Sequence, residues 1–234
     1  MKLLVSPINR EEAIIASIGG ADIVDVKNPK EGSLGANFPW VIRDVKAVVN
    51  GRQPISATIG DFNYKPGTAA LAALGAAVAG ADYIKVGLFD IQTEAQALEL
   101  LTKITRAVKD YDSSKKVVAS GYSDYKRINS ISPFLLPAIA AEAGVDVVMV
   151  DTGIKDGKST FEFMDEKELK EFTDLAHKHG LENAIAGSLK FEDLPILEKI
   201  GPDIIGVRGM VCGGDRRTSI RQELVEKLVA ECQV

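Results

Sequence analysis

Ionisable residues lie at the ends of four short apolar runs in this sequence, and their types favour chemistry on a carbonyl group. The residues are Asp25, Lys27, Lys85, Asp151 and Arg208. A lysine with a neutral amine attacks a carbonyl carbon and forms an imine, whereas an ordinary ammonium group does not. Neighbouring cations and partial burial both lower the pKa of a lysine, so a lysine cluster in a partly dry pocket favours the neutral amine. Lys27 and Lys85 are the first candidates for this chemistry.

Two carboxylates and a third lysine are placed to assist these amines. Asp25 precedes Lys27 by two residues, and Lys155 follows Asp151 by four residues in the next loop. A carboxylate can hold one lysine in its charged form while another stays neutral, and it can carry protons. We therefore take Asp25, Asp151 and Lys155 as candidate acid–base residues.

Strands that alternate with helices must position these side chains. Short β-branched runs occupy residues 2–6, 22–27, 54–60, 82–87, 116–121, 146–151, 183–188 and 203–208. Amphipathic stretches between them predict helices at residues 9–19, 38–49, 67–80, 92–109, 133–144, 165–179, 191–200 and 219–232. Strands that alternate evenly with helices indicate βαβ units and a parallel sheet. Eight such units predict an α/β fold with one domain over residues 1–234, a closed (β/α)8 TIM barrel.

The alternation of side chains along a strand determines which way the ionisable residues face. Asp25 and Lys27 share one face of their strand, and the valines beside them share the other. The same parity places Lys85, Asp151 and Arg208 opposite the residues that should contact the helices. We expect all of them to point into the mouth at the carboxyl ends of the strands, where active sites of such barrels lie. Buried charges are costly unless paired, so several inward charges of mixed sign indicate a functional site.

Four of the helix-to-strand junctions contain glycine followed by aspartate. These junctions are residues 19–22, 80–82, 144–146 and 201–203. Glycine supplies the left-handed conformation that commonly ends a helix. The aspartate then precedes a strand at the amino-terminal face of the barrel, where side chains mostly serve stability. We therefore expect these aspartates to be structural.

The loops after the last two strands suit an anion. Barrels of this type often bind phosphate there, and the loops contain Gly187 and Ser188 after strand seven and Arg208 and Gly209 after strand eight. Glycine lets backbone N–H groups approach an anion closely, and an arginine can direct two N–H groups at phosphate oxygens. These four residues are the predicted phosphate site. Cys212 follows them, but the sequence offers no histidine beside it to activate the thiol, so we interpret it as incidental.

Two further segments allow more than one interpretation. The longest loop, residues 28–37, follows the second strand and is either a lid over the mouth or a decorated turn. The helix around residues 69–81 is rich in small residues and reads as a buried helix. Its composition fits close helix packing or a subunit contact, and we expect the chain to form a homo-oligomer.

Composition excludes several classes of protein. The formal net charge is −5, with 28 basic and 33 acidic residues and no basic run, which argues against binding to nucleic acid or to an anionic membrane. The apolar stretch at the amino terminus is too short for a signal peptide, and two cysteines suggest a reducing cytoplasm. We expect no cofactor and no metal, since no cluster of His or Cys is present. A hard cation held by Asp25, Asp61 and Asp151 is the alternative.

Seven motifs together resemble one enzyme family. They are DVKNPKEGSLGANFPW (25–40), SATIGD (56–61), KPGT (65–68), GADYIKVGL (80–88), DTGIKDGK (151–158), AGSL (186–189) and GVRG (206–209). The sequence resembles the (5-formylfuran-3-yl)methyl phosphate synthases of methanofuran biosynthesis over essentially its whole length. The resemblance implies a (β/α)8 lyase that condenses two glyceraldehyde 3-phosphate molecules, a phosphorylated triose, with loss of phosphate and water. It implies Lys27 as the imine-forming lysine and Lys85 as a proton acceptor, with Asp25, Asp151 and Lys155 in support.

Other functions share parts of this pattern. A class I aldolase that acts on one sugar phosphate uses the same imine chemistry. The Asp-x-Lys pair at Asp25 and Lys27 is also similar to an element of nucleotide decarboxylase barrels, but the further aspartate of that family is not in register, since Asn28 and Lys30 follow. A barrel that binds a phosphorylated metabolite without turnover is the third possibility.

Overall fold

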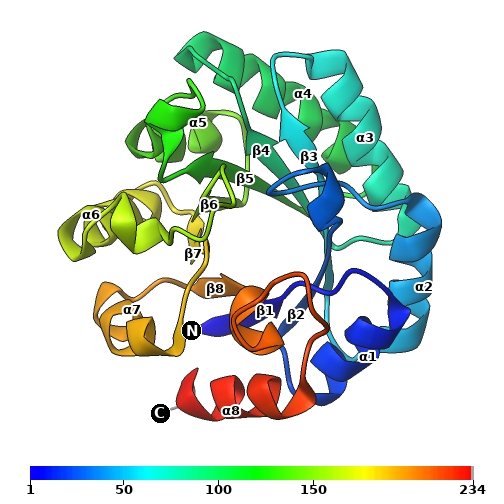
Figure 1. Ribbon diagram of the computed structural model, residues 1–234. Coiled ribbons are helices and arrows are strands. Elements are labelled where there is room, and N and C mark those ends of the chain that lie inside the picture. Colours follow the sequence, from blue (N-terminus) through cyan, green and yellow to red (C-terminus); the bar gives the residue numbers. More distant parts are fainter. Residues whose placement is uncertain (233–234) are drawn as a thin grey trace.

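Runs of β-branched and small apolar residues form eight parallel strands in the computed structural model, which describes residues 1–232. The strands are β1 (Lys2–Val5), β2 (Ile23–Val26), β3 (Ile55–Phe62), β4 (Tyr83–Leu88), β5 (Lys116–Tyr122), β6 (Val147–Asp151), β7 (Glu182–Ile185) and β8 (Ile204–Val207). Each strand pairs with the next, and β8 pairs with β1 from Lys2 opposite Ile204 onward, which closes the barrel (Figure 1). The predicted (β/α)8 barrel is confirmed.

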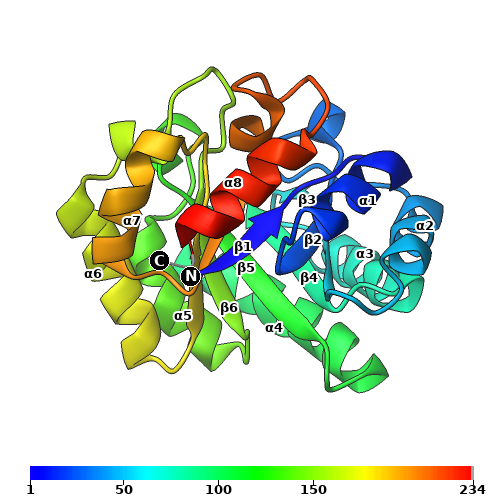
Figure 2. The same cartoon turned by 90° about the horizontal axis from the view of Figure 1, so that it is seen from below.

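Helices follow the strands and surround the barrel (Figure 1). They are α1 (Arg10–Ile18), α2 (Pro39–Val49), α3 (Pro66–Ala79), α4 (Glu94–Tyr111), α5 (Leu136–Glu142), α6 (Glu166–Lys178), α7 (Leu194–Ile200) and α8 (Gln222–Cys232). The predicted helices at 133–144 and 191–200 begin as 3-10 turns, η3 (Pro133–Leu135) and η5 (Phe191–Asp193). Further 3-10 turns are η1 (Pro29–Glu31), η2 (Tyr125–Arg127), η4 (Thr160–Glu162) and η6 (Gly209–Cys212). Figure 2 shows α8 crossing the outside of β1.

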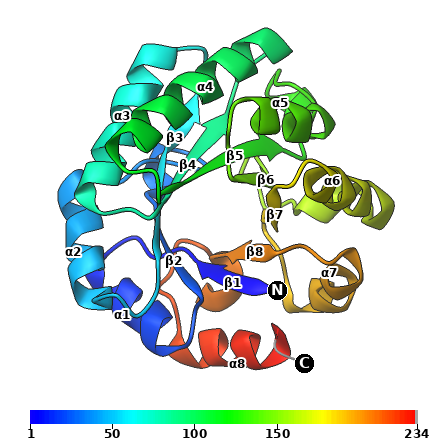
Figure 3. The ribbon, with the colours of Figure 1, turned by 180° about the vertical axis from the view of Figure 1, so that it is seen from behind.

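The junction aspartates connect neighbouring strands at the amino-terminal face of the barrel. Figure 3 views the barrel from this side. Each aspartate accepts a hydrogen bond of 2.7 to 2.8 Å from a backbone N–H of the preceding odd-numbered strand: Leu3 to Asp22, Ile55 to Asp82, Val117 to Asp146 and Asn183 to Asp203. These side chains thus satisfy strand N–H groups, as structural residues do. Gly80 and Gly201 end their helices in the left-handed conformation, but at the first junction Gly20, with φ +94°, takes it in place of Gly19.

Two apolar layers separate the inside of the barrel from its outside. The larger layer lies between the strands and the helices and includes Val24 and Val26. The smaller layer consists almost entirely of strand residues of opposite parity, among them Ile23 and Met149. Side-chain alternation therefore directs Asp25, two residues after Ile23, to the inside, above an apolar floor.

Helix α3 is buried on one side only. Ala69, Ala73 and Ala77 are buried, whereas Leu71 and Val78 are 73% and 57% exposed, so the prediction of a buried helix is correct for one side of α3 and wrong for the other. Small residues allow α3 and α4 to pack closely, which accounts for the composition without a subunit contact. The homo-oligomer stays a prediction. None of the helices within residues 1–232 is long and apolar enough to cross a membrane.

Candidate active site

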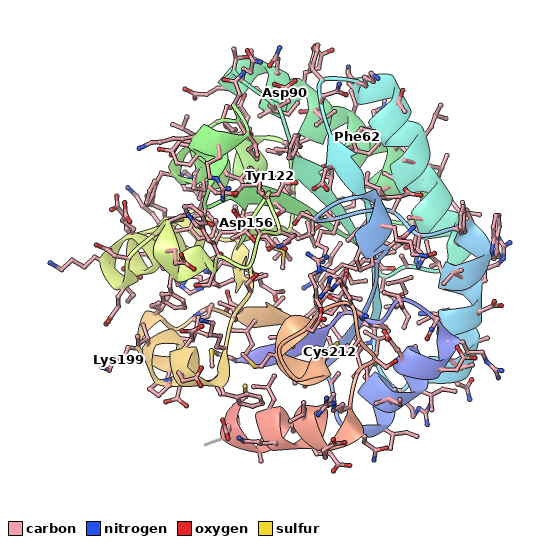
Figure 4. The ribbon with its side chains drawn as sticks, viewed as in Figure 1. Phe62, Asp90, Tyr122, Asp156, Lys199 and Cys212 are labelled. Carbon is pink, nitrogen blue, oxygen red and sulfur yellow. The ribbon has the colours of Figure 1, made fainter. Side chains whose placement is uncertain are left out.

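A cavity of about 1170 Å³ opens at the carboxyl ends of the strands. It exceeds the roughly 300–1000 Å³ of ordinary ligand pockets. Lys27, Lys85, Asp151 and Lys155 line it, so the structure brings the predicted lysines to one place. In Figure 4, Tyr122, at the end of β5, and Asp156 lie above the centre of the barrel, and Cys212, in η6, lies below it.

Asp25 and Lys85 form a buried ion pair at the base of the site. Lys85 Nζ lies 2.8 Å from Asp25 Oδ2, and the Ser6 hydroxyl donates to the same oxygen at 2.9 Å. Burial opposes ionisation of Asp25, but the ammonium groups of Lys85 and Lys27 hold its pKa below the usual value. The other oxygen, Oδ1, is buried without a hydrogen bond. A charged carboxylate with a free lone pair beside a lysine is equipped to receive or relay a proton.

Lys27 is the lysine whose charge the site disfavours. It follows the last residue of β2, and its side chain is buried, with only a 3.5 Å contact from Nζ to the carbonyl oxygen of Ser33. Burial lowers its pKa from 10.5 to about 7, with Lys85 and Lys155 acting in the same direction and Asp151 and Asp25 opposing them. A substantial fraction of the amine is therefore neutral near pH 7, as a nucleophile requires.

Asp151 and Lys155 form the second ion pair that acts on Lys27. Lys155 Nζ donates to Asp151 Oδ1 and, at 2.8 Å, to Thr152 Oγ1. The backbone N–H of Thr152 donates to the same carboxylate oxygen at 2.7 Å. Burial raises the pKa of Asp151, but Lys155 and Lys27 outweigh burial and lower it overall. Both carboxylates that act on Lys27 are therefore ionised.

The loop of residues 28–37 is closed over the site. The Ser33 hydroxyl donates to the carbonyl oxygen of Thr152 at 2.7 Å, and the Thr58 hydroxyl donates to that of Gly35 at 2.6 Å. Leu34 is fully buried. Hydrogen bonds from this loop to β3 and to the loop after β6 help to bury Lys27, so the loop is part of the site. Its movement as a lid stays a prediction.

Tyr122 and Asp61 hold that loop in place, and Tyr122 is not among the residues predicted from the sequence. The Tyr122 hydroxyl and, at 3.1 Å, the N–H of Leu34 donate to the Asp61 carboxylate. Burial raises the pKa of Asp61 despite these bonds. A Cβ on Gly32 would lie 2.2 Å from Asp61 Oδ2, so only glycine fits there. Tyr122 ends β5 at the same end of the barrel, so its place at a strand end is its signal in the sequence, although its side chain carries no charge.

The loops after β7 and β8 have free N–H groups in residues that line the cavity. Gly187, Ser188 and Gly209 line it, and none of their backbone N–H groups donates a hydrogen bond to another residue between 1 and 232. Gly187 and Ser188 have φ values of +102° and +53°. A Cβ on Gly187 would lie 2.2 Å from Thr160 Oγ1, so the turn requires glycine. Free N–H groups in a turn of this kind can bind an anion.

Arg208 does not face the cavity with free donors as expected. Its guanidinium donates to both oxygens of Glu12, at 2.7 and 3.3 Å, and to the carbonyl oxygen of Ser6. The remaining N–H groups bond the carbonyl oxygens of Arg216 and Thr218. An arginine has five N–H donors, and all are engaged, so the prediction of a phosphate fork at Arg208 needs correction. The donors of Arg208 are engaged because Glu12 of α1 lies beside it, a contact that the sequence did not predict.

The three carboxylates of the alternative metal site do not converge. Asp25, Asp61 and Asp151 each accept hydrogen bonds from a different partner. Within residues 1–232, no group of three or more His, Cys, Asp or Glu side chains is placed to hold a metal ion. Cys212 is buried and burial raises the pKa of its thiol, which fits the interpretation of that residue as incidental.

The fold and the position of this cluster are those of the (β/α)8-barrel enzymes, whose active sites lie at the same mouth. The 4-HFC-P synthase family model matches residues 3–229. A (5-formylfuran-3-yl)methyl phosphate synthase of Methanosarcina acetivorans is 94% identical over all 234 residues of both chains, and that of Archaeoglobus fulgidus is 58% identical over 98% of each. The chain therefore belongs to the 4-HFC-P synthase family. A solved 3-hexulose-6-phosphate synthase, 18% identical over 99% of both chains with a TM-score of 0.68, shares the fold.

Proposed function

We propose that this chain condenses two molecules of glyceraldehyde 3-phosphate into (5-formylfuran-3-yl)methyl phosphate. Inorganic phosphate and water are released, which makes the enzyme a carbon–oxygen lyase acting on phosphates. The names of the relatives support this product, and its place is the biosynthesis of methanofuran in the cytoplasm. The single observation that carries the chemistry is Lys27, a buried amine with a pKa of about 7 that two aspartate–lysine pairs influence.

The neutral amine of Lys27 attacks the aldehyde carbon of one substrate, and loss of water gives an imine. The imine withdraws electrons, so the C–H bond on the adjacent carbon becomes acidic. The Asp25–Lys85 pair collects that proton. The electron pair from this C–H bond forms a carbon–carbon double bond as the phosphate on the next carbon leaves. Asp151 and Lys155 supply or remove protons in the other steps.

Phosphate binding keeps the substrate in register with Lys27. The free N–H groups of Gly187, Ser188 and Gly209 hold a phosphate at the loops after β7 and β8. Met149 and the rest of the apolar floor limit water below the reacting carbon. Positioning of this kind supplies much of the rate enhancement of an enzyme with two substrates.

The deciding experiment mixes the protein with glyceraldehyde 3-phosphate alone. We expect released phosphate and a furan absorbance to rise together, and borohydride to fix substrate to the peptide that carries Lys27. An imine and a new carbon–carbon bond without phosphate release would indicate an aldolase. Binding of substrate with neither imine nor products would indicate a metabolite-binding barrel.

The rate of imine trapping should increase with pH through a value near 7. Only the neutral amine of Lys27 reacts, and its pKa of about 7 makes the neutral fraction grow as the pH rises past that point. Single-turnover borohydride trapping between pH 5.5 and 9 measures this increase of the trapping rate with pH.

The Asp151→Asn variant serves as its control. Asp151 raises the pKa of Lys27, so removing the charge of Asp151 should shift the rise in trapping rate to lower pH. An unchanged pH dependence of the trapping rate in Asp151→Asn would assign the titration to a group other than Lys27.

A further inference from the structure

Arg216 has a buried guanidinium nitrogen without a partner. It lies in the segment between η6 and α8, and its half-buried side chain lines the cavity. Its Nη2 atom is buried and makes no hydrogen bond, and within the described chain the side chain forms no ion pair. A charged donor buried without a partner costs free energy unless a ligand supplies the acceptor. The structure therefore leaves an acceptor to be provided by whatever occupies the cavity.

The surroundings of Arg216 indicate an anion. Three cations of the site have carboxylates of their own: Lys85 with Asp25, Lys155 with Asp151 and Arg208 with Glu12. Of the three arginines that line the cavity, Arg208 and Arg217 have carboxylate partners, whereas no carboxylate within residues 1–232 forms an ion pair with Arg216. Its Cβ lies 3.9 Å from the position that a Cβ on Gly209 would take. The side chain thus leaves the backbone beside a free N–H group of the expected phosphate loop.

Arg208 holds the backbone from which this side chain extends. Its Nε donates to the carbonyl oxygen of Arg216 at 2.8 Å, and its Nη2 donates to that of Thr218 at 3.1 Å. Arg208 is itself held by the buried pair with Glu12. A fixed backbone reduces the entropy lost when the guanidinium binds a ligand.

We propose that Arg216 is the side chain that binds a phosphate monoester dianion of the substrate, together with the N–H groups of Gly187, Ser188 and Gly209. Arg216 thereby takes the place that sequence analysis gave to Arg208. A guanidinium matches two phosphate oxygens with two parallel N–H donors. The identity of the substrate rests on the proposed function, whereas the recognition of phosphate by Arg216 does not.

The test is calorimetric titration with inorganic phosphate. We expect Arg216→Gln to weaken phosphate binding by a factor of about 10–100, the value of a charge-assisted hydrogen bond to a buried group. Arg216→Lys keeps the charge but lacks the planar guanidinium, so its phosphate affinity should lie between those of the unaltered protein and Arg216→Gln. The matched control is Arg217→Gln, which removes the same charge from the next residue, whose side chain is 87% exposed and paired with Asp215.

Thermal melting establishes that the variants are folded, and each outcome decides the proposal. Unchanged phosphate affinity in folded Arg216→Gln, or equal losses in both glutamine variants, would overturn it. Absence of phosphate binding by the unaltered chain would overturn it too. If Arg216→Gln weakens phosphate binding but the unaltered chain makes no furan, the phosphate site stands and the proposed function fails. With turnover, Arg216→Gln should raise KM more than it lowers kcat, since the phosphate is bound before and during the reaction.

Discussion

Replacing Lys27 with methionine should abolish turnover and all borohydride-dependent mass increase. We expect kcat to fall by on the order of 10⁴–10⁶-fold, the effect of removing a covalent nucleophile. Methionine nearly fills the volume of the lysine stem, and Lys27 is 7% exposed, so an apolar side chain is tolerated in this position. The loss would therefore reflect the missing amine and not a collapsed site.

Two measurements separate this interpretation from its rivals. Mass spectrometry of borohydride-treated, unaltered protein should place the substrate on the peptide that carries Lys27. Phosphate binding by Lys27→Met should be retained, since the amine is not part of the predicted phosphate site. Trapping on Lys85 or Lys155 with turnover preserved in Lys27→Met would contradict the assignment.

Replacing Lys85 with arginine should separate imine formation from the later steps. Arginine keeps the positive charge beside Asp25, now 2.8 Å from the lysine nitrogen, but it does not give up its proton. We expect substrate to be trapped on Lys27 at near-normal yield while turnover falls by on the order of 10²–10⁴-fold, the usual contribution of general acid–base catalysis. Single-turnover trapping and steady-state furan formation measure the two effects.

The environment of Lys85 makes a folding control necessary. Its side chain is 2% exposed, so the larger guanidinium could displace Asp25. Lys85→Met is the second variant. It removes a charge that lowers the pKa of Lys27, so trapping should persist but shift to higher pH, while turnover should be lost. Near-full turnover in Lys85→Arg would mean that charge alone suffices and that Lys85 does not transfer protons.

Local rules were sufficient for the strands and for the lysines at their ends. Side chains alternate along a strand, so Asp25 and Lys27 had to share a face once the run around them was a strand. Parallel strands in a barrel end at one mouth, which brought Lys85 and Asp151 to the same cavity although they are far apart in the sequence. The junction aspartates followed from the same repeat, since every βα unit begins at the same face.

Contacts across the sequence decided the rest of the site. Arg208 pairs with Glu12, 196 residues away, and this pair engages N–H donors of Arg208 that a phosphate would have needed. Ser33 donates a hydrogen bond to Thr152, 119 residues away, and this bond closes the loop over Lys27. Arg216 lies in an irregular segment, where no period of two or of 3.6 residues tells which way a side chain points.

The sequence by itself thus determined the barrel, the inward parity of Asp25, Lys27, Lys85 and Asp151, and the family. Tertiary structure alone decided which cations are paired and which remain available to a ligand. It also decided how far burial lowers the pKa of Lys27, because desolvation depends on all the atoms packed around the amine. Strand alternation is a local property of the backbone, whereas charge pairing and burial arise only when distant segments meet.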